Sequence, residues 1–353
     1  MKWLLIAISG WVLFGPGSCV TPSQNPLYTA VILPPKESKY HARATAIADG
    51  REFGYGNGTG TGTSTAGSID ESALAWQASP GSDPKLSVVE DGDSRLYGAS
   101  GDSEVGEWHY TAALWKPGIP DRINLTPPSS FGAAYGVYGS VQVGNVHLDY
   151  REAPHAYMWK GNVATAIDLN PQGYTQSTAW AVSGDTQVGE GTKADTGLTH
   201  ALMWHGSAES SVDLNPVAFM SSSSYGASGS YEVGCGARAA TGGLNHALLW
   251  HGSPSCVDLN PAGFASSEAR AAAGKFQVGF GTASKYSHAL LWEGDAGSYL
   301  DLHQFLESVR VDGKTMDSSA ATAVDTQGNV VGYAYIKDRP YDEIAILWRR
   351  NRP

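Results

Sequence analysis

Short apolar segments separated by polar, Gly-rich turns recur along the whole chain. Residues 177–215 contain one complete set. Ser177–Ser183 alternates small and large residues, and the Gly184-Asp185 pair that follows is a hairpin signal. The other three predicted strands are Thr186–Gly191, His200–Trp204 and Ser211–Leu214. Asn215-Pro216 ends the set, because proline cannot donate a hydrogen bond to a strand ladder.

Two markers show how often this set is repeated. An apolar segment ends in tryptophan at Trp76, Trp115, Trp159, Trp204, Trp250, Trp292 and Trp348. A hydrophobic residue followed by glycine occurs at Phe53-Gly54, Val105-Gly106, Val143-Gly144, Val188-Gly189, Val233-Gly234, Val278-Gly279 and Val331-Gly332. The two markers alternate strictly, which indicates seven units. Four short strands in roughly 40–45 residues are typical of one β-propeller blade.

The two ends of the repeat region complement each other. Most units end in a strand of the type IDL or VDL, but the last unit stops after Ile344–Trp348. A strand of the missing kind precedes the first unit, at Thr29–Pro35. We therefore predict an all-β, seven-bladed β-propeller of four-stranded blades over residues 28–353. The N-terminal strand should complete the last blade, which closes the ring and removes exposed sheet edges.

Composition narrows the range of partners. The 353-residue chain has 23 Lys and Arg against 34 Asp and Glu, a formal net charge of −11, and no basic run before the closing RRNRP. Nucleic-acid binding needs a basic face and is not expected. The sequence also contains no Walker loop, HExxH, CxxC cluster or nucleophile elbow. We expect no metal and no cofactor.

Residues 1–19 are typical of a secretion signal, with Lys2 before an apolar stretch too short to span a bilayer. Small residues precede Cys19, as at a bacterial lipoprotein cleavage site, although Pro16 replaces the usual leucine. Lipidation of Cys19 and simple secretion both remain open. Residues 20–27 form a short polar tether. The protein is expected to be secreted or anchored to the bacterial cell envelope, contacting the membrane only through that lipid.

Two cysteines remain in the repeats. Cys235 falls on the second predicted strand of a unit and Cys256 on the fourth. These strands are not neighbours, which makes the distance too long for a disulfide. We predict two free thiols, with a disulfide as the alternative in an oxidising compartment.

The recurring polar residues are predicted to be structural. His155, His200, His246 and His288 each lie four residues before a marker tryptophan. Equivalent positions on successive blades are too far apart to share a metal ion, so we expect each histidine to bond a neighbouring turn. The aspartates of the DLNP words and their relative, Asp168, Asp213, Asp258 and Asp301, should hold the backbone N–H groups of the next turn.

The middle of each first strand is the best candidate for a ligand site, because that strand lies nearest the propeller axis. Alignment on the hairpin glycine makes the following residues equivalent: Thr45, Tyr97, Tyr135, Trp180, Tyr225, Arg270 and Thr322. Aromatics here could stack on sugar rings, and Arg270 could pair with a carboxylate. The alternative is that these large residues only fill space left by Ala and Gly on the next blade. The ligand-binding candidates are Tyr97, Tyr135, Trp180, Tyr225 and Arg270.

A second candidate group lies in the first connecting loop. Tyr40, His41 and Arg43 are residue types that an acid–base enzyme acting on acidic sugars would use. Three polar residues in one loop do not by themselves define a catalytic site.

The words HALLW, DLNP and QVG together resemble the HAF family of bacterial extracellular repeats. The resemblance covers about residues 28–353 and is strongest from 155 to 302. It implies an exported protein of blade-like repeats, and it brings no catalytic motif with it.

The sequence favours a non-catalytic binding or scaffold module over an enzyme. It should act as a monomer on a glycan, a small ligand or a cell-envelope protein. The alternative is a carbohydrate-active enzyme, such as a propeller-fold polysaccharide lyase. A lyase should gather His, Tyr and Arg from several blades into one cleft, whereas a binding module needs only aromatic and hydrogen-bonding groups.

Overall fold

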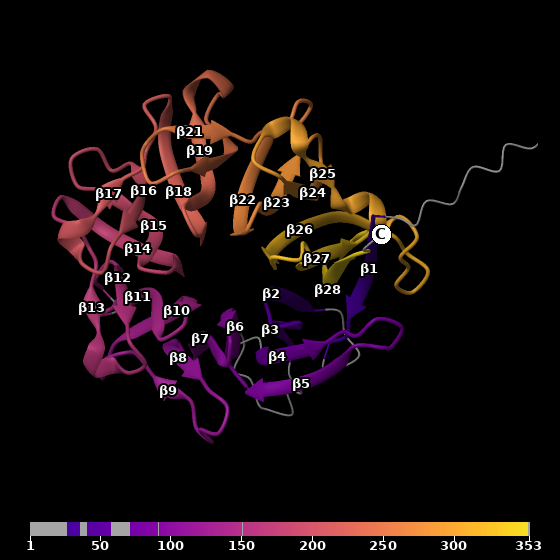
Figure 1. Cartoon of the computed structure of the whole chain (residues 1–353), viewed down its shortest axis with the longest axis horizontal. Helices are drawn as coiled ribbons and strands as arrows, with labels where there is room; N and C mark the ends of the chain where they lie inside the picture. The colour runs from indigo at the N-terminus through magenta and orange to yellow at the C-terminus, as the bar shows by residue number, and fades with distance from the viewer. Residues whose placement is uncertain (1–26, 36–40, 58–70, 91, 150, 352–353) are drawn as a thin grey trace, which may run out of the picture.

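The four-strand pattern of residues 177–215 is repeated around a ring. The computed structural model describes residues 27–35, 41–57, 71–90, 92–149 and 151–351. Within these ranges the chain forms seven four-stranded antiparallel sheets around a central channel, which is a seven-bladed β-propeller (Figure 1). The predicted fold class is confirmed. The signal segment 1–19, most of the tether and Tyr40 lie outside the described residues.

The innermost strand of each blade faces the channel. These strands are β2 (Ala42–Ala48), β6 (Ser94–Ser100), β10 (Phe131–Tyr138), β14 (Tyr174–Ser183), β18 (Phe219–Ser228), β22 (Ser266–Ala273) and β26 (Met316–Val324). The second strands are β3 (Arg51–Asn57), β7 (Ser103–Trp108), β11 (Val141–His147), β15 (Thr186–Lys193), β19 (Tyr231–Arg238), β23 (Phe276–Thr282) and β27 (Val330–Ile336).

The two outer strands of each blade follow. The third strands are β4 (Glu71–Gln77), β8 (Thr111–Trp115), β12 (His155–Trp159), β16 (Thr199–Trp204), β20 (Leu244–Trp250), β24 (Ser287–Trp292) and β28 (Arg339–Arg350). The fourth strands are β5 (Lys85–Glu90), β9 (Ile123–Asn124), β13 (Ile167–Asp168), β17 (Val212–Asp213), β21 (Cys256–Asp258), β25 (Leu300–Asp301) and, in the last blade, β1 (Tyr28–Leu33).

Helix is confined to short 3-10 turns in the described ranges. They are η1 (Val163–Thr165), η2 (Ala208–Ser210), η3 (Ala239–Thr241), η4 (Ala296–Ser298) and η5 (Leu302–Leu306). The longest of these turns, η5, directly follows β25. None of the described helices has the length and apolar character needed to cross a bilayer.

Strand β1 closes the ring as predicted. It pairs antiparallel with β28 from Tyr28 opposite Arg350 to Leu33 opposite Ala345. The Tyr28 hydroxyl also donates to the Gly328 carbonyl at 2.9 Å. Both ends of the described chain therefore lie in one blade, and the outer edge of β28 is paired rather than open.

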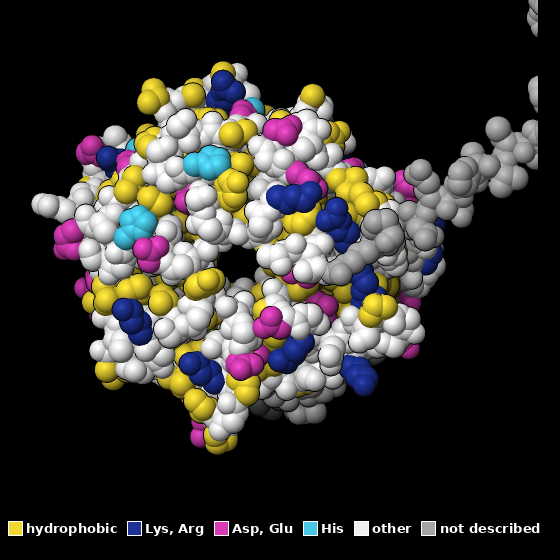
Figure 2. All heavy atoms as spheres, in the orientation of Figure 1, with side chains coloured by type: hydrophobic (Ala, Val, Ile, Leu, Met, Phe, Trp, Pro, Cys, Tyr) yellow, Lys and Arg dark blue, Asp and Glu magenta, His cyan; other side chains and the backbone are white. Residues whose placement is uncertain are grey.

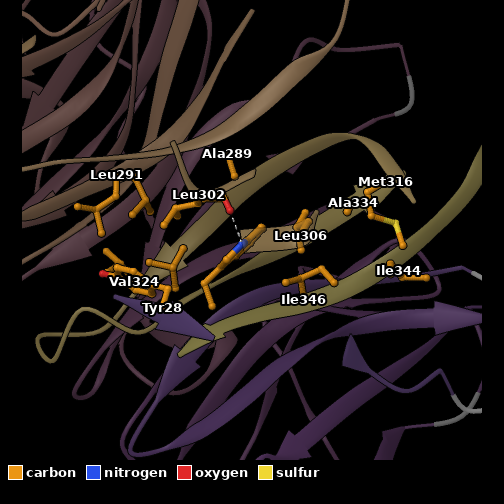
Figure 3. Packing of buried hydrophobic residues seen from close by; sticks show 14 of the residues in the cluster. Tyr28, Ala289, Leu291, Leu302, Leu306, Met316, Val324, Ala334, Ile344 and Ile346 are labelled. Atoms are coloured by element: carbon orange, nitrogen blue, oxygen red, sulfur yellow. Dashed lines mark hydrogen bonds between the residues drawn. The ribbon is translucent and has the colours of Figure 1, made fainter. Parts of the chain in front are cut away.

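The core lies between successive blades. All seven marker tryptophans are buried, and five of them, from Trp159 onward, have no exposed surface. Between the last two blades, Trp348 donates its indole N–H to the Leu302 carbonyl at 3.0 Å. Figure 3 shows this cluster, with Tyr28 of β1 packed among aliphatic side chains such as Leu302 and Ile346. The tryptophans are therefore inter-blade packing residues.

The repeated His and Asp residues are structural. His155 Nδ1 lies 2.8 Å from Asp168 Oδ2, and Asp168 Oδ1 accepts from the Asn170 backbone N–H at 2.8 Å. The same pair of contacts occurs at His200 with Asp213, His246 with Asp258 and His288 with Asp301. The expected role of the aspartate is thus observed. The histidine differs from expectation, because it bonds the carboxylate of the adjacent strand rather than a turn.

The asparagine of DLNP joins neighbouring blades. Asn170 Oδ1 accepts from the Ser177 hydroxyl at 2.7 Å, and that hydroxyl accepts from the Ala156 backbone N–H of the preceding blade at 2.9 Å. Equivalent three-residue links occur at Asn215, Ser222 and Ala201 and at Asn260, Ser267 and Ala247. The words that define the repeat therefore specify how one blade attaches to the next.

The two repeat cysteines are free. Cys235 lies on β19 and Cys256 on β21, with β20 between them in the sheet. Their placement on a second and a fourth strand is as predicted.

Candidate functional site

A β-bulge displaces one residue in the middle of every innermost strand. In β14, Ala179 pairs with Gly189 and Ala181 with Val188, which leaves Trp180 outside the ladder. The same shift leaves one residue unpaired in each of the other blades. The displaced residues are Thr45, Tyr97, Tyr135, Trp180, Tyr225, Arg270 and Thr322. A bulge re-aims the side chain of its extra residue, and here all seven point into the channel.

The glycine of the second sequence marker permits this bulge. A Cβ atom added at Gly189 would lie 1.9 Å from the Thr178 carbonyl oxygen, closer than any real contact allows. Only glycine lets the innermost strand approach the second strand so closely beside the bulge. The hydrophobic-Gly marker and the channel residue are therefore parts of one local structure.

The displaced residues line a cavity of about 500 Å³ in the channel. Figure 2 shows the channel as a hollow at the centre of the ring. The other described lining residues are Arg43, Tyr55, Phe280, Ala320, Ala321 and Tyr333. Arg43 and Ala320 also line the cavity, and each lies two residues before the displaced residue of its strand. The cavity therefore lies towards the face where the innermost strands begin. Beyond the same ring, towards the opposite face, small residues such as Gly98 and Ala181 line a smaller space of about 200 Å³.

Four successive blades form an aromatic arc on one side of the cavity, consisting of Tyr97, Tyr135, Trp180 and Tyr225. The ring centroids of Tyr97 and Tyr135 are 5.3 Å apart, and those of Tyr135 and Trp180 are 4.4 Å apart. Trp180 meets Tyr225 edge to face at 6.2 Å. The rings therefore pack on one another and also border the cavity.

The second strands complement the arc. Where the innermost residue is aromatic, a small or polar side chain lies behind it: Glu107 accepts from the Tyr97 hydroxyl at 3.2 Å, and Cys235 lies 3.8 Å from the Tyr225 hydroxyl. Where the innermost residue is not aromatic, at Thr45, Arg270 and Thr322, an aromatic from the second strand reaches the cavity instead. These are Tyr55, Phe280 and Tyr333.

Sequence reasoning missed Tyr55, Phe280 and Tyr333. Each directly follows the glycine of the second marker. In other blades this position holds a smaller or polar residue, such as Glu107 or Cys235. A comparison of residue sizes at this position with those on the innermost strand could have identified the three aromatic residues.

Arg43 and Arg270 line the cavity, and both are paired. Arg43 donates through Nε to both carboxylate oxygens of Glu343 at 2.7 Å, and its guanidinium lies 4.3 Å from the Tyr333 ring centroid. Arg270 pairs with Glu268 and lies 4.4 Å from the Tyr225 ring centroid. Each guanidinium is thus held between a carboxylate and an aromatic face.

His41 joins the pair formed by Arg43. Its Nδ1 lies 2.9 Å from Glu343 Oε1, and the hydrogen bond to Glu343 raises the pKa of His41 although burial opposes this. Burial alone would raise the pKa of Glu343, but the bonds from His41 and Arg43 outweigh it and lower that pKa. The group is therefore a compact ion-pair cluster between the first and last blades.

Burial raises the pKa of four phenols in the cavity wall. Burial raises the pKa of Tyr55 and Tyr135 to about 12 and raises those of Tyr97 and Tyr225 further. Burial also raises the pKa of the Cys235 thiol to about 12, which makes it a poor nucleophile at neutral pH. These groups can donate hydrogen bonds, and their raised pKa values disfavour the deprotonated forms that would act as bases.

Known proteins share this fold but not this sequence. No protein-family model and no curated protein sequence matches the chain. Among solved structures, the acylaminoacyl peptidase of Pyrococcus horikoshii aligns with a TM-score of 0.56 at 9% identity, over 88% of this chain and 51% of the peptidase chain. The β-propeller domain of the Trilobed protease from Pyrococcus furiosus aligns with a TM-score of 0.54 at 8% identity, over 88% of this chain and 94% of that domain.

These similarities establish the propeller fold alone. TolB from Acinetobacter baumannii aligns with a TM-score of 0.49 at 11% identity, over 71% of this chain. The chain spans 62% of TolB and about half of the peptidase. The Trilobed protease domain is described as having an open velcro topology, whereas β1 and β28 close the ring here.

Proposed function

We propose that this protein is a non-catalytic binding module of the bacterial cell envelope, whose ligand site is the aromatic-lined cavity. One observation carries the proposal: seven equivalent bulges direct their side chains into one cavity, and four successive side chains there are aromatic. Aromatic faces next to hydrogen-bonding groups suit a ligand with ring faces, such as a glycan. The export signal predicted over residues 1–19 and the resemblance to HAF repeats support the location.

The face around the cavity mouth also suits binding. Exposed apolar side chains recur where the second strand of a blade passes into the third, which is the face where the innermost strands begin. They are Tyr110, Leu148, Leu198, Leu244, Tyr286 and Tyr341. Recurrent exposed apolar residues around a pocket mark contact surfaces for larger ligands or partners.

The described chain begins on the other face. Tyr28 pairs with Arg350 at the end of β28, so β1 begins on the face opposite the cavity mouth. A lipid on Cys19 would then hold the propeller with its mouth directed away from the membrane. This orientation is part of the proposal.

The test is a glycan array with wild type and the Trp180→Ala variant. Loss of the Trp180 ring should weaken binding about tenfold or more while the unfolding temperature changes little. Trp108→Ala is the matched control, because Trp108 is half-buried and does not line the cavity. Equal losses of stability and binding in Trp180→Ala would show that the arc only fills space.

The alternative is a polysaccharide lyase, and one observation favours it. Arg43 and Tyr55 of the first blade, Tyr97 of the second and Tyr225 of the fifth line one cavity. A lyase would need one of them as a base, and the raised pKa values of these phenols oppose that role. Parallel detection of unsaturated sugar products by ultraviolet absorbance decides the matter: product release that His41→Ala abolishes would replace the binding proposal with the enzyme.

A further inference from the structure

The charged groups at the cavity neutralise one another, and this bears on the ligand. Among the described lining residues, Arg43 and Arg270 carry the positive charge. An anionic ligand would have to recruit one of them. What each guanidinium already contacts therefore decides whether the site accepts an anion.

Arg43 is already paired within the protein. Its Nε contacts both oxygens of Glu343, and its Nη2 donates to the Tyr335 hydroxyl at 3.1 Å. Glu343 is only 2% exposed. Removing the guanidinium from Glu343 would leave a buried carboxylate short of its main partner, which is strongly unfavourable.

Arg270 is held in a similar way. Glu268 Oε2 pairs with its guanidinium, while Glu268 Oε1 accepts from the Asn245 side-chain amide at 3.0 Å. The Tyr225 and Phe280 ring centroids lie 4.4 and 5.4 Å from the guanidinium carbon. Glu268 therefore holds Arg270 in place, and Asn245 holds Glu268.

Further carboxylates lie behind the aromatic arc. Arg95 is shared between Glu71 and Glu107. Glu190 on β15 adds another negative charge near Tyr135 and Tyr225, whose pKa values it raises in addition to burial. In the described part of the chain, carboxylates thus outnumber guanidiniums around the cavity.

We propose that the cavity selects neutral glycans and rejects uronates and other anionic glycans, an inference that rests on the proposed binding function. A sugar hydroxyl can accept from a guanidinium N–H and donate to the paired carboxylate, so it leaves both ion pairs intact. A carboxylate ligand must displace Glu343 or Glu268, or else face them as a like charge. The aromatic arc contributes stacking that does not depend on charge.

The experiment measures binding of neutral and uronate oligosaccharides of matched length by calorimetry. The probes are oligomers of glucose, galactose, mannose and N-acetylglucosamine against oligomers of glucuronate and galacturonate. Wild type should bind at least one neutral series about tenfold more tightly than any uronate series. That binding should change little with NaCl concentration, since no new ion pair forms.

The Glu268→Gln variant provides the positive test. The introduced amide can keep the bond from Asn245 through its carbonyl oxygen while it releases the charge of Arg270. We expect the affinity of this variant for uronates to rise about fivefold or more relative to its affinity for the neutral ligand. Glu293→Gln is the matched control, because Glu293 pairs with Lys275 on the surface, away from the cavity.

The outcomes separate this inference from the proposed function. Tighter wild-type binding of uronates, weakened by Trp180→Ala, would overturn the neutral selectivity and leave the binding function standing. No gain of uronate affinity in folded Glu268→Gln would overturn the charge-pairing argument. If that variant does not fold, the effect of NaCl concentration on wild-type binding of the neutral ligand is the deciding measurement. A strong dependence of that affinity on NaCl would overturn the inference. Binding of no glycan, or binding that Trp180→Ala leaves unchanged, would remove the proposed function itself.

Discussion

A buried carboxylate in the first blade should make this propeller less stable as the pH rises. Glu52 lies at the start of β3, is 3% exposed, and accepts from the Ala78 backbone N–H at 3.2 Å. The equivalent residue of the third blade is Gln142, which accepts from the Gly161 N–H at 2.7 Å and donates to the Ser140 carbonyl at 3.0 Å. Gln187 and Gln277 make the same pair of bonds in their blades. A glutamine at this position both accepts and donates a hydrogen bond, whereas an ionised glutamate can only accept.

Burial raises the pKa of Glu52 from 4.5 to about 7, although the backbone N–H of Ala78 opposes this. The folded state therefore keeps a proton that the unfolded state has already lost between pH 4.5 and 7. The stabilisation is complete below pH 4.5, falls as the pH rises, and is gone above 7. A shift of this size corresponds to about 3 kcal/mol of unfolding free energy at pH 7 and above.

The Glu52→Gln variant should remove this penalty. Its unfolding free energy should match wild type near pH 4.5 and exceed it by about 3 kcal/mol one pH unit above the folded pKa, which raises the unfolding temperature by about 4 °C. Urea and thermal unfolding followed by tryptophan fluorescence at the two pH values measure both quantities. The mirror control is Gln142→Glu, which should lose stability only at the higher pH. An equal gain for Glu52→Gln at both pH values, or none at either, would refute the reasoning.

Two further predictions concern the bulge and an acid-sensitive histidine. Gly189→Ala should lower the unfolding free energy by about 3 kcal/mol or more, because its Cβ overlaps the Thr178 carbonyl; a cost below about 1 kcal/mol in chemical denaturation would contradict the close approach. His303 stacks on His288 at 4.2 Å, and burial with that neighbour lowers its pKa to about 4, so stability should fall as the pH drops from 6.5 towards 4. His303 contacts the Ser319 hydroxyl, and in other blades an asparagine such as Asn170 takes this position and accepts from the equivalent serine. The His303→Asn variant should therefore lose less stability at acid pH in thermal unfolding. An unchanged pH profile would count against this explanation.

The fold was predictable because each blade repeats the same words at the same places. Tryptophan at the end of the third strand and glycine in the second gave the blade number, and both have one physical role in every unit. The absence of a fourth strand after Trp348 pointed to closure by Thr29–Pro35, which the structure places at Tyr28–Leu33. Because every blade packs against its neighbour in the same way, the residues that make this contact recur at regular intervals in the sequence.

The candidate site was predictable only in part. The displaced residues share one position relative to the hairpin glycine, so Trp180 and its equivalents were found by alignment. Tyr55 and Tyr333 were missed, since they reach the cavity only where the inner neighbour is as small as Thr45 or Thr322. That relation involves two strands and is not visible in the pattern of either one.

The ion pairs of the cavity were not predictable from local pattern. Arg43 and Glu343 are separated by 300 positions in the chain and meet because the last blade adjoins the first. From the sequence, Arg43 was expected to act as a cation for an acidic sugar. Its partner Glu343 lies on β28, where the sequence pattern predicted only a strand. Burial of Glu343 beside His41 follows from ring closure, but neither residue belongs to a repeated motif, so their contact is not visible in the pattern.

The candidate site therefore depends on departures from the repeat rather than on the repeat itself. At the junction of the last and first blades the aromatic arc is replaced by Thr45 and Thr322, whose hydroxyls bond the backbone of the next blade at 2.6 Å. These small residues leave the space into which Tyr55 and Tyr333 face. A ring of identical blades would have filled its channel evenly, either with aromatics or with threonines. Unequal blades instead give the cavity an aromatic wall and a charge-paired side, an asymmetry that under the proposed function would hold a ring-shaped ligand in one orientation.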